Sequence, residues 1–197
     1  MKSSPRSWPA RSRTTANYGR WEIVGDPTEV SLIVAARKVK ADRKIKRYTR
    51  VGEIPFTSER KRMSIIAKDS TDSDKLTVFA KGAPDVLLSY CTRIRVGGQV
   101  RKLTEGDRQS ILATVERLSS EAYRTLGEAC RPLETSSLAD VPGVSVNAAG
   151  QVSDIADQAE AIETDLIWNG MVGIIDPPRT EVRDSVTEAH RAGIRTV

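Results

Sequence analysis

Cysteine, histidine and long apolar runs are all scarce in this sequence, and each scarcity excludes a class of protein. The only cysteines are Cys91 and Cys130, too few for the disulfide framework of a small secreted domain, so two reduced thiols are expected. The single histidine, His190, cannot join two distant cysteines in a zinc site of recognisable spacing. No apolar run approaches the ~20 residues that span a bilayer. Neither a metal site nor direct membrane insertion is therefore predicted.

The composition that remains is that of a globular protein. Hydrophobic residues make up 39% of the 197 residues and charged residues 29%, which is enough apolar material for a core. The first 20 residues are basic and rich in serine and arginine, with no apolar segment and no periodicity. They predict neither a signal peptide nor a regular element, and we interpret residues 1–20 as a basic arm outside the fold.

The net charge of +5 is unevenly distributed along the chain. The first 102 residues carry 23 Lys or Arg against 10 Asp or Glu, whereas the remainder carry 8 against 16. A basic half of this kind can attract a nucleic acid, an acidic membrane surface or a polyphosphate. Charge alone does not choose among these three.

Local patterns predict alternating strands and helices. Asp26 as an N-cap, Pro27 in the first helical position and Glu29 three residues after the cap predict a helix start. Gly97-Gly98 between two β-branched runs predicts a tight hairpin. The remaining signals are periodicities. Together they predict helices over 26–41, 83–90, 104–122 and 180–191, strands over 48–54, 63–68, 76–81, 94–96, 100–103, 123–133 and 166–175, and a further strand from 194.

A change of architecture is predicted near residue 166. Residues 134–163 carry Ser, Gly, Asn and Asp without clear periodicity, and we interpret them as a surface excursion. Before this excursion the pattern favours an α+β domain, an antiparallel sheet flanked by helices, over residues 21–165. After it, residues 166–197 form a strand–helix–strand pattern that favours a partial α/β segment.

Four motifs in order resemble those of one family. Lys81-Gly82-Ala83-Pro84-Asp85 is similar to the KGAPE motif of P-type ATPases, and Phe56 with the stretch through Ser64 resembles the family's phenylalanine and the basic Met-Ser segment after it. Asp176-Pro177-Pro178-Arg179 resembles the return into the phosphorylation domain, and the segment 25–29 is of the kind seen in calcium and sodium pumps. The resemblance covers residues 22–197 and implies the nucleotide-binding domain of a P-type cation pump, followed by the start of its phosphorylation domain.

The resemblance implies that ATP is the ligand and assigns a role to each motif residue. Phe56 would stack on adenine with Met63 beside it, while the alternative makes Phe56 an ordinary core aromatic. Glu29 would accept a hydrogen bond from the adenine amino group, and its alternative is a capping role.

The same resemblance implies a phosphate end for the site. Lys81 would line the deep end, and Gly82 would let the ligand approach the backbone closely. Arg131 resembles the family arginine that meets the phosphates, and its alternative is a surface arginine. Ser58 departs from the calcium-pump pattern, which has arginine there, so one cation is lost unless Arg60 or Arg62 replaces it. Otherwise the basic run from Arg60 to Arg62 is interpreted as a solvated face.

The remaining expectations concern the parent pump. Asp176, Pro177, Pro178 and Arg179 would form a stiff hinge onto the phosphorylation domain, since each proline fixes φ and withholds a donor. The DKTGT, TGE and GDG motifs that phosphoryl transfer requires in this family do not occur in the chain. It would therefore bind ATP without hydrolysing it, on the cytoplasmic side, beside the phosphorylation and membrane domains of a parent pump.

Magnesium would enter only with that pump, because no ligands for it are identified in this sequence. Two other functions are open at this stage: a basic nucleic-acid-binding module and a complete small ATPase that acts alone. Aromatic residues make up only 5% of the sequence, and no stripe of alternating aromatic and basic residues occurs, so no nucleic-acid partner is expected.

Overall fold

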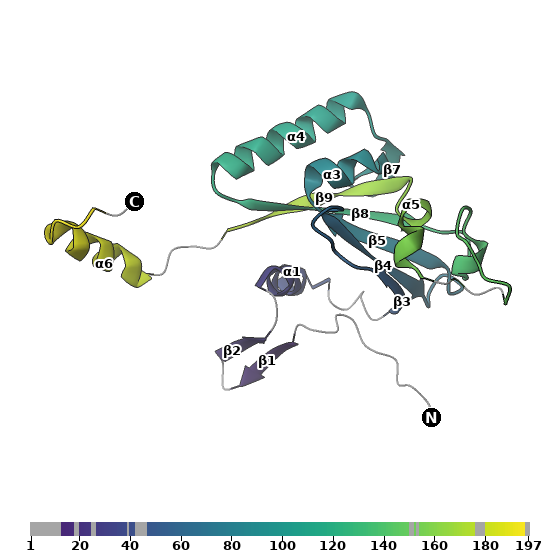
Figure 1. Cartoon of the computed structure of the whole chain (residues 1–197), viewed down its shortest axis with the longest axis horizontal. Coiled ribbons are helices and arrows are strands. Elements are labelled where there is room, and N and C mark those ends of the chain that lie inside the picture. The colour runs from purple at the N-terminus through teal and green to yellow at the C-terminus, as the bar shows by residue number, and fades with distance from the viewer. Residues whose placement is uncertain are drawn as a thin grey trace.

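The structure is a computed structural model. It describes residues 13–17, 20–24, 27–38, 40–41, 47–149, 152, 154–175 and 180–195. Within them a seven-stranded sheet forms the body of the molecule, and Figure 1 shows helices on both sides of it. The expected α+β class, an antiparallel sheet flanked by helices, is confirmed.

The order of strands across the sheet is β3-β4-β5-β8-β9-β6-β7. Every neighbouring pair is antiparallel except β6 and β9, which run parallel. The strands span β3 (Tyr48–Ile54), β4 (Arg62–Asp69), β5 (Leu76–Gly82), β6 (Cys91–Val96), β7 (Gln99–Lys102), β8 (Arg124–Pro132) and β9 (Leu166–Ile174).

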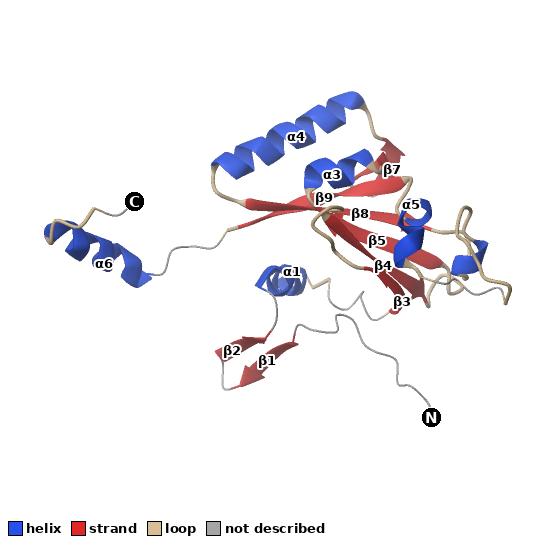
Figure 2. Cartoon of the chain, viewed as in Figure 1, coloured by secondary structure: helices blue, strands red, loops and turns tan. Residues whose placement is uncertain are grey.

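One face of this sheet carries the hydrophobic core, and we call it the core face. Helix α3 (Pro84–Ser89) covers one half, with α4 (Glu105–Ser120) outside it, as Figure 2 shows. The first cluster joins α3 and the strands through Leu87, Ala80 and Trp168. The second joins Ile66 and Val78 to the segment after β8. Ala80 and Val78 are two residues apart on β5, so both clusters lie on the same face.

The opposite face of the sheet carries helix α1 (Pro27–Lys38), and we call it the α1 face. Val30 of this helix is 3% exposed. The helix begins at Pro27, as the sequence predicts, while the proposed cap Asp26 lies outside the described residues. The predicted helix over 180–191 is confirmed as α6 (Thr180–Arg191).

The boundary expected at residue 166 does not coincide with an edge of the sheet. β9 lies between β8 and β6, and its residues Leu166, Ile167 and Trp168 are buried. A continuous apolar run is typical of a strand covered on both faces, but it does not indicate which strands will pair with it. The strand therefore belongs to the seven-stranded sheet, and any change of architecture comes after it.

The described part of residues 134–163 is anchored to the core at a few buried positions, so it is not a simple surface excursion. They form η1 (Leu138–Asp140), η2 (Ala156–Gln158) and α5 (Ala159–Ile162). Val141, Ile162 and Glu163 are 2%, 0% and 0% exposed. The elements are too short for a periodic signal, which is why the sequence pattern did not indicate them.

The two ends of the chain also differ from expectation. Residues interpreted as a basic arm contribute β1 (Arg13–Asn17), which pairs with β2 (Arg20–Val24) in a separate two-stranded sheet. Threonine, tryptophan, isoleucine and valine in these segments favour strands, and this outweighs the lack of alternation. At the other end, the expected last strand is absent at Ile194 and Arg195, and residues 196–197 lie outside the described part.

Candidate functional site

Three of the side chains that matter for the site stand in a row across the α1 face. Met63 on β4 lies opposite Lys81 on β5, and Lys81 lies opposite Glu128 on β8. Directly opposed residues in antiparallel strands point to the same face and lie close together. All three are partly buried. The structure thus brings together Met63 and Lys81, as the motifs predicted, and adds a carboxylate that the sequence did not indicate.

Helix α1 places a second carboxylate on Lys81. Lys81 Nζ donates to Glu29 Oε1, and the two side chains are 22% and 34% exposed. Glu29 lies in the first turn of α1, where the helix dipole favours a negative charge. The two sequence-predicted residues are therefore in direct contact, with the lysine ammonium between Glu29 on one side and Glu128 on the sheet.

Burial raises the pKa of Glu128, and the nearby charge of Lys81 opposes that rise. The carboxyl of Glu128 therefore holds its proton to a higher pH in the folded protein than in the unfolded chain. The stability that this provides is fully present below the unfolded pKa of 4.5 and is lost as pH rises through the higher folded pKa.

We therefore expect Glu128→Gln to reduce the loss of stability that the protein shows between pH 4.5 and neutrality. Urea unfolding at both pH values, in wild type and variant, measures the difference. Glu134→Gln is the matched control. It removes the same charge, but the pKa of the exposed Glu134 is shifted in the opposite direction, downward, by its hydrogen bond with Lys75. Equal pH slopes for wild type and Glu128→Gln would contradict the prediction.

Phe56 lies in the loop between β3 and β4 and is 59% exposed. The alternative reading, an ordinary core aromatic, is thus wrong. An exposed ring on a loop can stack against a ligand, because it is not committed to the interior.

Packing within the sheet is sufficient to require a glycine at position 82, and the expected approach of a ligand there stays a prediction. A Cβ at this position would lie 2.5 Å from the Lys61 carbonyl oxygen and 2.6 Å from the Cβ of Arg62. The strand β4 itself therefore occupies the space beside Gly82, and no ligand is needed to explain the glycine.

Arg131 lies apart from the other candidates. It is opposite Val78, on the core face, and its Nη1 donates to the carbonyl oxygens of Ala161 at 2.8 Å and Ile162 at 3.2 Å. The structure does not bring it to Lys81. The exposed Arg124, four residues before Glu128 on the same strand, does share the α1 face by strand alternation.

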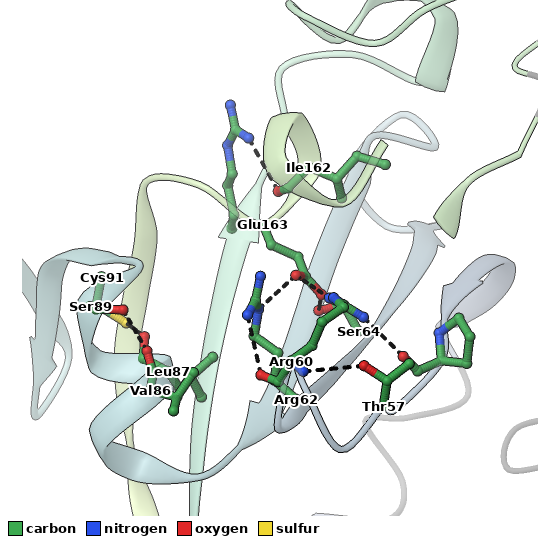
Figure 3. A network of polar contacts seen from close by, with 12 residues as sticks. Thr57, Arg60, Arg62, Ser64, Val86, Leu87, Ser89, Cys91, Ile162 and Glu163 are labelled. Atoms are coloured by element: carbon green, nitrogen blue, oxygen red, sulfur yellow. Dashed lines mark hydrogen bonds and ion pairs between the residues drawn. The ribbon is translucent and has the colours of Figure 1, made fainter. Parts of the chain in front are cut away.

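The interpretation of residues 60–62 as a solvated face is wrong for both arginines. Arg62 is 5% exposed, and its Nε donates to Glu163 Oε2 at 2.7 Å. Arg60 Nη2 also donates to Glu163 Oε2, and Ser64 Oγ donates to Oε1 at 2.6 Å. Figure 3 shows these side chains converging on the one carboxylate. The Arg62 guanidinium also lies over the Tyr90 ring, 3.8 Å from its centroid.

The proposed hinge, Asp176, Pro177, Pro178 and Arg179, lies outside the described residues and stays a prediction. Within the described ranges there is no group of three or more His, Cys, Asp or Glu side chains that could hold a metal ion. In the same part of the chain, no helix has the length and apolar character to cross a membrane.

Comparison with known proteins connects this arrangement to a family. The profile described as "P-type ATPase, cytoplasmic domain N" matches residues 10–181. The chain therefore belongs to the family of P-type ATPase cytoplasmic N domains, and the match begins inside the segment interpreted as an unmatched arm.

Individual relatives agree with this assignment. The chain is 39% identical to calcium-transporting ATPase 1 of Bacillus cereus over 92% of its own length and 18% of the relative's. It is 35% identical to the sodium/potassium exporting P-type ATPase cta3 of Schizosaccharomyces pombe, over 90% and 15% respectively. With the probable cation-transporting ATPase F of Mycobacterium tuberculosis, 33% identity extends over 89% and 17%. The chain thus spans less than a fifth of each relative.

Proposed function

We propose that this chain is the nucleotide-binding domain of a P-type cation pump and that it binds ATP on the α1 face around Lys81. The observation that carries the proposal is the meeting of Glu29, Met63 and Lys81, three residues assigned by separate motifs, at one place. Helix α1 is distant in sequence from the β4–β5 hairpin, so the contact between Glu29 and Lys81 is not a consequence of local structure.

The chemistry of the face suits a nucleotide. The thioether of Met63 provides apolar surface for a base on this face, and the exposed ring of Phe56, on the loop before β4, would add a second apolar surface. Lys81 provides a cation, and Arg124 adds a second on the same face of β8. Glu29 is an acceptor for the adenine amino group, and to take that role it exchanges its bond with Lys81 for one with the base.

The arginine assignment is revised by this geometry. The sequence motif assigned phosphate contact to Arg131, whose guanidinium instead bonds the end of α5 on the core face. Arg124 is the better candidate for that contact, because it projects from the same face as Lys81. Gly82 remains beside the site as part of the Lys-Gly motif, in a role set by strand packing.

The rest of the pump is part of the proposal. The chain would act on the cytoplasmic side of the membrane, with Asp176–Arg179 leading to the phosphorylation domain and the membrane domain beyond. Magnesium would arrive with ATP in the parent pump, and no residue of this chain is assigned to it. The chain by itself would bind ATP without turnover.

Titration of the isotopically labelled protein with ATP, followed by amide chemical shifts, tests the proposal. We expect saturable shifts around Phe56, Met63 and Lys81, with an affinity in the high-micromolar to millimolar range because partner domains also hold the phosphates in the pump. Amides of the β6–β7 turn at Gly97 and Gly98 serve as the internal control. Absence of shifts around Lys81 at millimolar ATP would refute the proposal.

A further inference from the structure

We propose that Arg60 is a positioning residue, anchored by Glu163, that holds Phe56 in place to receive the base. The inference rests on the proposed function, since it assumes that Phe56 meets the adenine ring. It gives Arg60 a positioning role in place of the two that the sequence suggested, a replacement cation or a solvated side chain, and in this role Arg60 does not itself touch the nucleotide.

The first step is that packing does not hold Phe56. Phe56 is 59% exposed, and its neighbours from Pro55 to Glu59 are exposed as well. A loop of this kind samples many conformations unless polar contacts restrict it. Whatever orders the ring must therefore act through the backbone on either side of it.

The second step is that Arg60 contacts both flanks of Phe56. Its Nη1 donates to the carbonyl oxygen of Pro55 at 2.9 Å, one residue before the ring. Its backbone N–H donates to Thr57 Oγ1 at 3.2 Å, one residue after the ring. Lys61 N–H closes the same turn onto the Thr57 carbonyl at 2.8 Å. The Arg60 side chain thus holds the residue before Phe56, while backbone N–H groups of Arg60 and Lys61 hold the residue after it.

The third step is that the Arg60 side chain is attached to a rigid part of the fold. The other end of the Arg60 fork, Nη2, donates to Glu163, which is 0% exposed (Figure 3). Glu163 is held in turn by Ser64 Oγ at 2.6 Å and Arg62 Nε at 2.7 Å, both from β4. A carboxylate that accepts three hydrogen bonds inside the protein has little freedom to move. Through Arg60 and Glu163, the position of the loop is therefore fixed relative to β4 and the end of α5.

The same anchor is connected to the lysine of the site. Arg62 lies opposite Gly82 in the β4–β5 ladder, one residue from Lys81. The Ala83 N–H also donates to the Lys61 carbonyl at 3.0 Å. One network therefore sets the relative positions of Phe56 and Lys81, the two ends of the proposed nucleotide site.

The geometry requires an arginine rather than any cation. Two nitrogens of one planar guanidinium reach two acceptors, the Pro55 carbonyl and Glu163, that belong to different segments. A lysine ammonium at this position keeps the charge but has a single nitrogen. Arg60→Lys and Arg60→Ala are therefore expected to release the segment before Phe56 equally, while the backbone hydrogen bonds to Thr57 remain.

Labelling with fluorophenylalanine tests this directly, because the chain has only two phenylalanines, Phe56 and Phe79. Phe79 lies in β5 with its ring 5.0 Å from that of Tyr48 and serves as the internal control. In Arg60→Ala and Arg60→Lys we expect the ¹⁹F resonance of Phe56 to narrow and move toward its urea-unfolded position, while that of Phe79 stays. ATP affinity should fall about tenfold, the effect of ordering a side chain and its loop on binding.

Arg117→Ala is the matched charge control, since Arg117 is an exposed arginine on α4 paired with Glu121. It should leave both resonances and the affinity unchanged. An unmoved Phe56 resonance in both Arg60 variants, wild-type affinity in Arg60→Lys, or an equal loss in Arg117→Ala would overturn the inference. If the wild-type protein binds no ATP, the proposed function fails, and the role of Arg60 in base binding fails with it. The ¹⁹F spectra of the ligand-free proteins still decide whether Arg60 orders Phe56.

Discussion

Glu163→Gln is expected to lower the free energy of unfolding by about 3–5 kcal/mol, the usual cost of removing one partner from a buried ion pair. The carboxylate is 0% exposed and receives both arginines, and the side chain of Arg62 is only 6% exposed. Glutamine keeps the shape but leaves the two guanidinium groups close together without a counter-charge. Urea denaturation monitored by circular dichroism measures the change, which would remove a large part of the stability of a domain of this size.

The control for this prediction is Ser64→Ala. It removes one donor to Glu163, the hydroxyl at 2.6 Å, and leaves both ion pairs in place. The loss should then be about 1 kcal/mol, the typical net contribution of one hydrogen bond. If the Glu163→Gln protein were as stable as Ser64→Ala, the prediction would be wrong. Water would then solvate the two guanidinium groups well enough to replace the carboxylate.

Much of the fold could be predicted because its signals are local. The β4–β5 and β6–β7 hairpins, the helix after Pro84 and the helix that begins at Thr104 all depend on residues within a few positions of one another. Thr104 and Asp107 form the capping box that such a start favours, with Asp107 N–H donating to Thr104 Oγ1 at 3.2 Å. The position of β9 between β8 and β6 depends on contacts across tens of residues, and no local signal specifies those.

Strand parity decides which side chains share a face with Lys81. Consecutive residues on a strand point to opposite faces, so a motif match displaced by an odd number of residues moves the side chain to the wrong face. Arg131 is three residues from Glu128, which places it on the core face, whereas Arg124 is four residues away and shares the α1 face. Counting outward from the residue opposite Lys81 would have favoured Arg124, but that register is a property of the fold.

Parity also offered a signal for the buried network. Ser64 shares parity with Ile66 on the strand predicted over 63–68, and Arg62 has the same parity one residue before it. A buried Ile66 therefore implies that Ser64 points inward, and Arg62 too once the strand is extended to it. A buried arginine requires a carboxylate, but the nearest one in sequence, Glu59, is exposed in the structure. The partner, Glu163, lies about a hundred residues later, in a segment whose sequence has no clear periodicity.

Lys81→Ala is expected to weaken ATP binding about 10- to 100-fold, or about 1.4–2.8 kcal/mol at 25 °C. The ammonium lies between Glu29 and Glu128. Its removal deletes an attraction to the nucleotide and leaves two carboxylates to face a polyanion, and hydrogen bonds to charged groups are typically worth this much. Calorimetric or chemical-shift titration with ATP measures the affinity, once thermal unfolding has shown that the variant is folded.

Two further proteins separate the effect of this site from that of charge in general. Lys75→Ala removes the same charge just before β5 begins, at an exposed lysine paired with Glu134, and should bind ATP as the wild type does. Adding Glu29→Gln to Lys81→Ala should recover part of the lost affinity, because one of the two uncompensated carboxylates is then neutral. Equal losses in Lys75→Ala and Lys81→Ala would mean that ATP responds to the overall basic charge of the first half of the chain. In that case the meeting of α1, β4 and β5 at Lys81 would be a feature of folding and not of nucleotide binding.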